Sequence, residues 1–154
     1  MDGFNLYHGV HQLAGRRHLW LDLERLSRNL LPDDHQLSAV KYFTAPVRGT
    51  SRSRHRQDRY LQALDVHCAA LKITTGRFQK QTRRCWSCGT QWTTYEEKES
   101  DVNLAIALVE DAALDRFDTA LVISGDSDLV PAVRAAKRLR PETEVVAVFP
   151  PGRA

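Results

Sequence analysis

Residues 119–131, TALVISGDSDLVP, decide the fold of this chain. The aliphatic run Leu121–Ile123 predicts a buried strand, and the amphipathic pattern that begins after Asp128 predicts a helix. Asp126 and Asp128 therefore lie where a parallel strand passes into a helix, which is the edge at which α/β sheets bind their ligands. Two carboxylates this close oppose each other's ionisation unless a cation neutralises them. The stretch therefore predicts a divalent metal site.

Strands and helices alternate along the rest of the chain. The expected helices cover residues 6–14, 19–31, 54–68, 102–114 and 127–139, and the expected strands cover residues 37–44, 71–75, 119–124 and 144–149. Residues 46–53 and 79–95 are expected to be irregular. Strands that alternate with helices predict an α/β fold with a parallel, doubly wound sheet.

Length and composition predict one globular domain that covers residues 1–154. Apolar residues make up 42% of the chain, charged residues 27%, and the net charge is +3, which are ordinary values for a soluble protein. No signal peptide or membrane-spanning run is evident, and three cysteines do not make a disulfide framework. We therefore expect the protein to lie in the reducing cytoplasm. The chain shows no glycine-rich nucleotide loop and no arrangement typical of a serine hydrolase triad.

Acidic residues recur at three places that the alternation brings to one edge of the sheet. These places hold Asp2 with Asn5, then Asp101, then Asp126 with Asp128. Carboxylate ligands favour Mg²⁺ or Mn²⁺ over zinc, and such ions assist displacement at phosphorus. The amide of Asn5 is suited to orient a phosphate. The alternative is that the acids only cap helices, with Ser127 as the cap and Asp128 in the first turn of one helix, and with Asp101 as the N-cap of another.

Basic residues gather in two segments that flank the acidic places. They are Arg48, Arg52, Arg54, Arg56 and Arg59 in the first segment, and Arg77, Lys80, Arg83 and Arg84 in the second. Such a distribution favours a polyanion held by arginines, although solvated loops are the alternative. Trp86, Trp92 and Tyr95 accompany the second segment and are suited to stack on unpaired bases, with core packing as the alternative.

Cys85 and Cys88 have the spacing of half a zinc ribbon. A closed structural zinc site needs four ligands, and His67 with Cys68 are the nearest further ligand types in the sequence. One interpretation is a structural zinc site formed by these four residues that orders the inserted loop at about 79–95. The other is two free thiols in that loop.

Three blocks of the sequence resemble the signature blocks of NYN domains, which are PIN-like ribonucleases, and the LabA-like type is the most similar. The blocks are DGFNLY at 2–7, EKESDV at 97–102 and SGDSDL at 124–129. Their order and spacing extend over essentially the whole chain. The resemblance implies a Rossmann-like, PIN-like sheet flanked by helices and metal-dependent hydrolysis of RNA phosphodiester bonds.

The resemblance also implies roles for individual residues. The metal-binding and catalytic acids would be Asp2, Asp101, Asp126 and Asp128; Asn5 and Ser124 would support the site, and Lys98 would contact phosphate. Among the basic residues, we expect Arg52, Arg54 and Arg83 to hold the backbone of single-stranded or loop RNA. We expect no membrane partner, and whether the chain forms a homodimer is left open. Two alternatives remain: a catalytically weak RNA-binding or regulatory module, and another metal-dependent phosphohydrolase.

One departure from the NYN pattern concerns the sheet. Members of that family carry an apolar central strand before the DGFN block, whereas only Met1 precedes Asp2 here. We expect either a start upstream or a sheet with a truncated first strand. We favour the upstream start, because loss of a central strand costs several kcal/mol of a total stability of about 5–15 kcal/mol.

Overall fold

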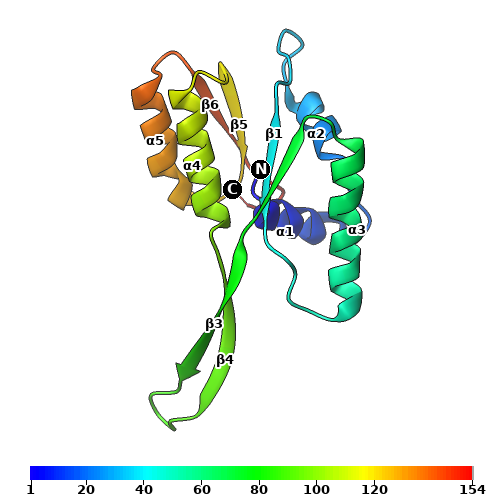
Figure 1. Ribbon diagram of the computed structural model, residues 1–154, viewed down its shortest axis with the longest axis vertical. Helices are drawn as coiled ribbons and strands as arrows, with labels where there is room; N and C mark the ends of the chain where they lie inside the picture. The colour runs from blue at the N-terminus through cyan, green and yellow to red at the C-terminus, as the bar shows by residue number, and fades with distance from the viewer. Residues whose placement is uncertain (154) are drawn as a thin grey trace.

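The computed structural model describes residues 1–153, whose secondary structure alternates as expected (Figure 1). The helices are α1 (Gly3–Ala14), α2 (Leu23–Leu30), α3 (Ser51–His67), α4 (Ser100–Ala113) and α5 (Val130–Leu139), with a short 3-10 helix η1 (Ser127–Leu129) before α5. The strands are β1 (Val40–Thr44), β2 (Leu71–Thr75), β3 (Arg77–Arg84), β4 (Gln91–Lys98), β5 (Thr119–Ile123) and β6 (Glu144–Val148).

The central sheet consists of two parallel pairs that Met1 and Asp2 connect. Strand β1 pairs with β2, and β5 pairs with β6. Asp2 forms a parallel bridge with Phe43 of β1, and its backbone N–H donates to the carbonyl of Ile123 in β5 at 2.9 Å. A cavity of about 400 Å³ lies beside Met1, lined by residues of both β1 and β5. The α/β, PIN-like fold class is confirmed, with a small sheet that is not closed.

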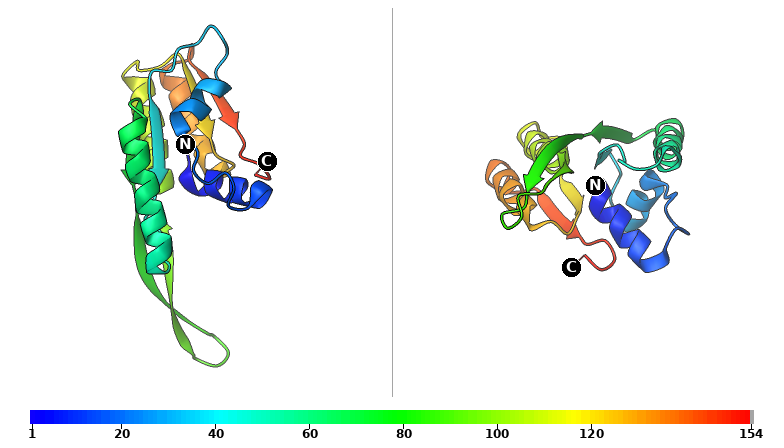
Figure 2. Two further views of the ribbon diagram at one scale, coloured as in Figure 1. Left: turned by 90° about the vertical axis from the view of Figure 1, so that its right-hand side faces the viewer. Right: turned by 90° about the horizontal axis from the view of Figure 1, so that it is seen from below.

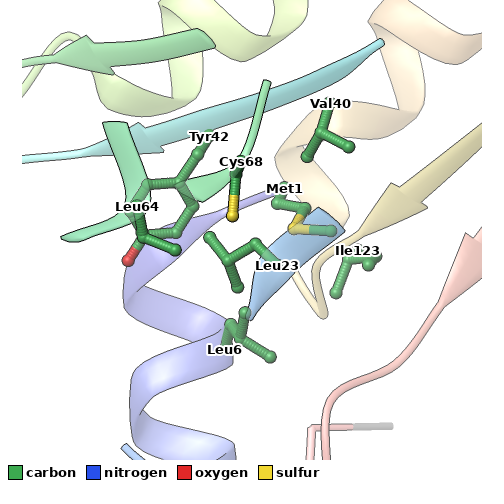
Figure 3. Close-up of a cluster of buried hydrophobic side chains, with 8 residues drawn as sticks. All are labelled: Met1, Leu6, Leu23, Val40, Tyr42, Leu64, Cys68 and Ile123. Carbon is green, nitrogen blue, oxygen red and sulfur yellow. The ribbon is translucent and has the colours of Figure 1, made fainter. Parts of the chain in front are cut away.

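Helices cover both pairs of strands. Helices α4 and α5 lie together beside β5 and β6, whereas α1, α2 and α3 lie around β1 and β2 (Figures 1 and 2). The larger hydrophobic core joins the N-terminus to β1, β5 and the first three helices, and its members are Met1, Leu6, Leu23, Val40, Tyr42, Leu64, Cys68 and Ile123 (Figure 3). A second core lies between α4, α5 and the β5–β6 pair. These cores hold the sheet edge where the acidic residues converge.

Helix α1 starts directly against the end of β1. Asp2 caps it by accepting the backbone N–H of Asn5 at 3.0 Å. A side chain at Gly3 would place its Cβ only 2.7 Å from the carbonyl oxygen of Phe43 and 2.9 Å from the Tyr42 hydroxyl. Only glycine therefore allows this close approach, which fixes Asp2 at the sheet edge.

The expectation of an irregular segment at 79–95 is wrong. Residues 77–98 form an antiparallel hairpin, in which β3 and β4 pair in register from Arg77 with Lys98 to Arg84 with Gln91. The hairpin projects away from the helices (Figures 1 and 2). Most of its side chains are exposed on both faces, so the sequence lacks the alternation of apolar and polar residues that marks a half-buried strand.

Four expected boundaries also differ. Helix α1 begins at Gly3 rather than at residue 6, and α3 begins at Ser51, within the segment 46–53 that was expected to be irregular. Helix α2 begins at Leu23 rather than near residue 19, because Asp22 caps it by accepting the backbone N–H of Arg25. Strand β1 begins at Val40 rather than at residue 37.

Candidate functional site

Asp2 is the buried centre of the candidate site, with only 3% of its surface exposed. Its Oδ2 accepts hydrogen bonds from the side-chain amide of Asn5 and, at 2.7 Å, from the hydroxyl of Ser124. Ser124 lies 122 residues further along the chain. Two of the expected site residues, Asn5 and Ser124, therefore hold the carboxylate of Asp2 in place.

Ser124 also connects Asp2 to the Asp126–Asp128 pair. Its hydroxyl oxygen accepts the backbone N–H of Asp126 at 3.1 Å, and Oδ1 of Asp126 accepts the backbone N–H of Asp128 at 2.8 Å. The capping alternative expected Ser127 as the cap of this helix, but the cap of η1 is Asp126. Its second carboxylate oxygen has no hydrogen bond within residues 1–153. Capping thus leaves one oxygen of Asp126 for a ligand.

Asp101 lies in the first turn of α4, not at its cap as expected. The N-cap is Glu99, whose backbone is in the left-handed conformation (φ 84°) and whose side chain makes no capping hydrogen bond. Partial desolvation, together with the negative charges of Asp2, Asp126, Glu97 and Asp128, raises the pKa of Asp101 to about 6. The three acidic places of the sequence therefore meet at one edge of the sheet, close enough for their charges to repel.

Glu97 and Ser100 complete the site, and neither was predicted from the sequence. Oε1 of Glu97 accepts the backbone N–H of Ser100 at 3.2 Å. Ser100 is 3% exposed, and its buried hydroxyl has no hydrogen-bond partner among the residues the structure describes. A signal was present, because both residues belong to the EKESDV block. A buried hydroxyl without a partner at this edge favours a polar ligand there.

The donor set fits a hard divalent cation in its chemistry. The acids at the edge offer only carboxylate oxygens, and their mutual repulsion is the condition that a cation relieves. Nevertheless, no three His, Cys, Asp or Glu side chains within residues 1–153 lie close enough together to hold an ion as they stand. Asp101 and Asp128 are exposed, so their carboxylates are open to a cation from solvent.

Lys98 and Arg83 do not reach the acids at the sheet edge. Lys98 Nζ lies 3.1 Å from Oε2 of Glu96, and Arg83 pairs with the other oxygen of Glu96. Both basic residues are therefore bound along the hairpin. In contrast, Arg52 and Arg54 are exposed in the first turn of α3, and neither forms an ion pair within the described part of the chain.

An arginine and a tyrosine connect the basic segment before α3 to the hairpin. The guanidinium of Arg48 lies 3.4 Å from the ring centre of Tyr95, a cation–π contact. Tyr95 and Trp92 are each about half exposed, and Trp86 is fully exposed. The alternative that these aromatic side chains pack in the core is therefore wrong for Trp86.

The four expected zinc ligands do not come together. Cys68 is buried in the larger core beside Tyr42 and Leu23 (Figure 3), where its thiol lies 3.5 Å from Oδ1 of Asp22 and burial raises its pKa. Cys85 and Cys88 lie at the turn between β3 and β4, at the far end of the hairpin (Figure 1). Proximity in sequence was misleading, because β2 and the whole length of β3 separate Cys68 from that turn.

At the hairpin turn, hydrogen bonds from the side chain and backbone of Thr90, and a further bond with Cys85, lower the pKa of the Cys88 thiol to about 7. All three cysteines are free thiols. None of the helices within residues 1–153 is long and apolar enough to cross a membrane.

Comparisons with known proteins extend this description. Over 180 aligned residues the chain is 29% identical to 6-hydroxy-3-succinoylpyridine 3-monooxygenase HspA of Pseudomonas putida (strain DSM 28022 / S16). The alignment covers 94% of this chain and 55% of that relative, so the chain spans about half the relative's length. No solved structure matches the chain. The NYN domain pattern matches residues 1–154, and the chain therefore belongs to the NYN domain family, within the PIN-like nuclease superfamily.

Proposed function

We propose that this protein is a ribonuclease of the LabA-like NYN type that hydrolyses RNA phosphodiester bonds with Mg²⁺ or Mn²⁺. The observation that carries the proposal is the convergence of Asp2, Asp101, Asp126 and Asp128 from three separate parts of the chain, which the raised pKa of Asp101 reports. Membership of the NYN family supports a hydrolase of the nuclease kind.

In this proposal the four aspartates hold the cation. When bound, the ion withdraws charge from the phosphodiester and so assists its hydrolysis. Asn5 and Ser124 keep the carboxylate of Asp2 oriented through their hydrogen bonds. A side-chain amide has two N–H groups, so Asn5 keeps one for a phosphate oxygen while it donates the other to Asp2. The unpaired hydroxyl of Ser100 is a second donor for the substrate.

Binding of RNA is assigned to the exposed basic and aromatic side chains. Arg52 and Arg54 supply phosphate contacts that do not depend on sequence. Trp92 and Trp86 expose ring surface on the hairpin, which suits stacking with the bases of single-stranded RNA. Arg83 contributes less than the sequence analysis expected, because Glu96 already pairs with it. The same proposal places the protein in the reducing cytoplasm, in keeping with three free cysteines.

The test is cleavage of a fluorescently labelled single-stranded RNA by the full chain, with and without Mg²⁺ or Mn²⁺. Asp126→Asn should lower the cleavage rate about a thousandfold, since a ligand of the ion is worth several kcal/mol. Asp65→Asn is the matched control, because Asp65 is exposed on α3 and lies outside the acidic edge. Equal cleavage by both variants, in preparations free of contaminating nuclease, contradicts the proposal.

Two further outcomes would identify the alternatives. Salt-dependent RNA binding without turnover indicates a regulatory module. The observation in favour of this alternative is that no three ligand side chains within residues 1–153 are already close enough to hold a metal ion. Cleavage of a chromogenic phosphomonoester without cleavage of RNA indicates another phosphohydrolase.

The similarity to HspA favours a second candidate, oxygenation of a hydroxypyridine. A cluster of carboxylates offers no group that activates oxygen by itself, and the chain lacks a glycine-rich nucleotide loop. We therefore place this candidate second. The direct test is to incubate the purified chain with 6-hydroxy-3-succinoylpyridine in the presence of air and a reduced nicotinamide. Chromatography then measures whether this compound is consumed.

A further inference from the structure

The turn between β3 and β4 is the most exposed part of the molecule that the proposed function does not use. It consists of residues 85–90, CWSCGT, which we call the hairpin tip. The tip lies at the end of an arm that projects from the body, away from every helix (Figures 1 and 2). Trp86 is fully exposed there, and so is much of Cys88.

The backbone of the hairpin tip is closed by its own hydrogen bonds. The N–H of Cys85 donates to the carbonyl of Thr90 at 2.8 Å, and the N–H of Gly89 donates to the carbonyl of Cys85 at 3.0 Å. Gly89 has a φ of 72°, a left-handed conformation that a residue with a side chain rarely adopts. The sequence Cys-x-x-Cys-Gly therefore forms a tight, pre-organised turn.

Cys85 and Cys88 both belong to this closed turn, and both are free thiols. Sγ of Cys88 lies 3.2 Å from Oγ1 of Thr90. A cysteine sulfur binds metal as its thiolate.

Two adjacent thiolates are half of a tetrahedral zinc site. Zinc in structural sites takes four ligands, and cysteine sulfur is among its preferred donors. Within residues 1–153 no third His, Cys, Asp or Glu joins this pair, and Cys68 is enclosed in the core. The chain therefore offers two ligands at the tip and needs two more from outside.

A second copy of the chain supplies matching ligands. Two-fold symmetry would bring two identical tips together around one ion, each with Cys85 and Cys88. An ion with four thiolates carries a net negative charge, and Arg84 provides the compensation. Its guanidinium lies 3.5 Å from the position that a Gly89 side chain would occupy, and it forms no ion pair in the described part of the chain. Contact between two tips would also cover Trp86.

We propose that Cys85 and Cys88 form half of a zinc site, and that the hairpin tips of two copies of this chain share one Zn²⁺ through four thiolates. This site is separate from the acidic edge, and the proposal stands whether or not the chain cleaves RNA. It assigns the projecting hairpin a role in assembly.

The experiment adds zinc chloride to the reduced, chelator-treated full chain and measures mass and bound metal by native mass spectrometry and light scattering. The expected result is a dimer that holds one zinc ion per two chains and separates when a chelator removes the metal. Cobalt substitution should give the intense visible absorption of a tetrahedral thiolate site.

Variants at the tip make the test specific. Cys85→Ser and Cys88→Ser should each lose the zinc and the dimer, whereas Ser87→Ala in the same turn should keep both. Circular dichroism should be the same for all three variants, because the hairpin tip contacts no core. The proposal is overturned by one zinc ion per monomer, by no zinc binding, or by a dimer that persists in the presence of chelator and reductant.

Discussion

The acidic edge and the hairpin tip are built in opposite ways. The acidic edge, formed by Asp2, Asp101, Asp126 and Asp128, joins residues from both ends of the chain through buried hydrogen bonds, such as that of Ser124 with Asp2. The hairpin tip uses six consecutive residues and its own backbone bonds. The comparison teaches that chemistry at the edge depends on the whole fold, whereas chemistry at the tip depends only on a local turn.

The largest effect should come from a change that breaks the edge and its support together. Asp2→Asn exchanges a buried carboxylate that accepts hydrogen bonds from Asn5 and Ser124. RNA cleavage should fall about a thousandfold or more. The free energy of unfolding should fall by about 1–3 kcal/mol, because the amide of Asn5 and the hydroxyl of Ser124 lose the carboxylate oxygen that accepts their hydrogen bonds. Cleavage assays and urea titrations measure the two effects.

Cys88→Ser is the counterpart of Asp2→Asn at the tip. It should change the free energy of unfolding of the zinc-free protein by less than about 0.5 kcal/mol. Comparable destabilisation by the two variants would remove the contrast between the regions.

A second pair of variants compares packing alone. Leu23 is fully buried in the larger core, whereas Trp86 is fully exposed. Leu23→Ala should lower the free energy of unfolding by about 2–5 kcal/mol through lost burial and the cavity left behind. Trp86→Ala should alter it by no more than about 0.5 kcal/mol. Thermal unfolding followed by circular dichroism distinguishes the two, and a large loss in Trp86→Ala would show that the tip packs against the body.

A third comparison separates free arginines from paired ones. The double variant Arg52→Gln/Arg54→Gln should weaken binding of single-stranded RNA about tenfold. It should also reduce the slope of affinity against salt concentration by the amount that corresponds to about two phosphate contacts. Arg83→Gln should weaken binding only about twofold, because Glu96 already neutralises that guanidinium. Fluorescence anisotropy at several salt concentrations measures both, and an equal loss would mean that Arg83 leaves Glu96 when RNA binds.

The smallest effect concerns the charge of Asp101. Its pKa in the folded protein is about 6, above the ordinary value of 3.8, so the protonated form suits the fold better. Without metal, the contribution of Asp101 to stability should therefore fall as the pH rises from about 4 to about 6, and stay low above that. Asp101→Asn should stabilise the metal-free protein at about pH 8 by about 1 kcal/mol, since solvent screens this exposed group.

The measurement for Asp101 is the melting temperature in the presence of chelator at acidic and alkaline pH. The gain from Asp101→Asn should be small near pH 4, where the aspartate is protonated in the folded state and about half protonated in the unfolded state. Addition of Mn²⁺ should stabilise the natural chain more than the variant. A variant that is less stable than the natural chain at alkaline pH would contradict the repulsion described at the acidic edge.

Much of the site was predictable because it depends on local patterns. The strand before Ser124 and the helix after Asp128 follow from residue type and periodicity, and parallel strands end at a common edge. The position of Asp126 at that edge follows from this rule, whereas Asp101 follows the antiparallel strand β4 and the rule does not place it. The hairpin was not predictable in the same way, because its strands are held by backbone pairing and carry polar side chains on both faces.

The sequence by itself determined the α/β alternation, the three acidic blocks and the Cys-x-x-Cys-Gly turn, since each depends on residues that are close in the chain. Only the three-dimensional structure shows that Ser124 connects Asp2 to Asp126, that Cys68 is buried far from the hairpin tip, and that Glu96 binds Arg83. The physical reason is that local conformation follows from neighbouring residues, whereas hydrogen bonds and ion pairs between distant residues depend on how the helices pack against the sheet.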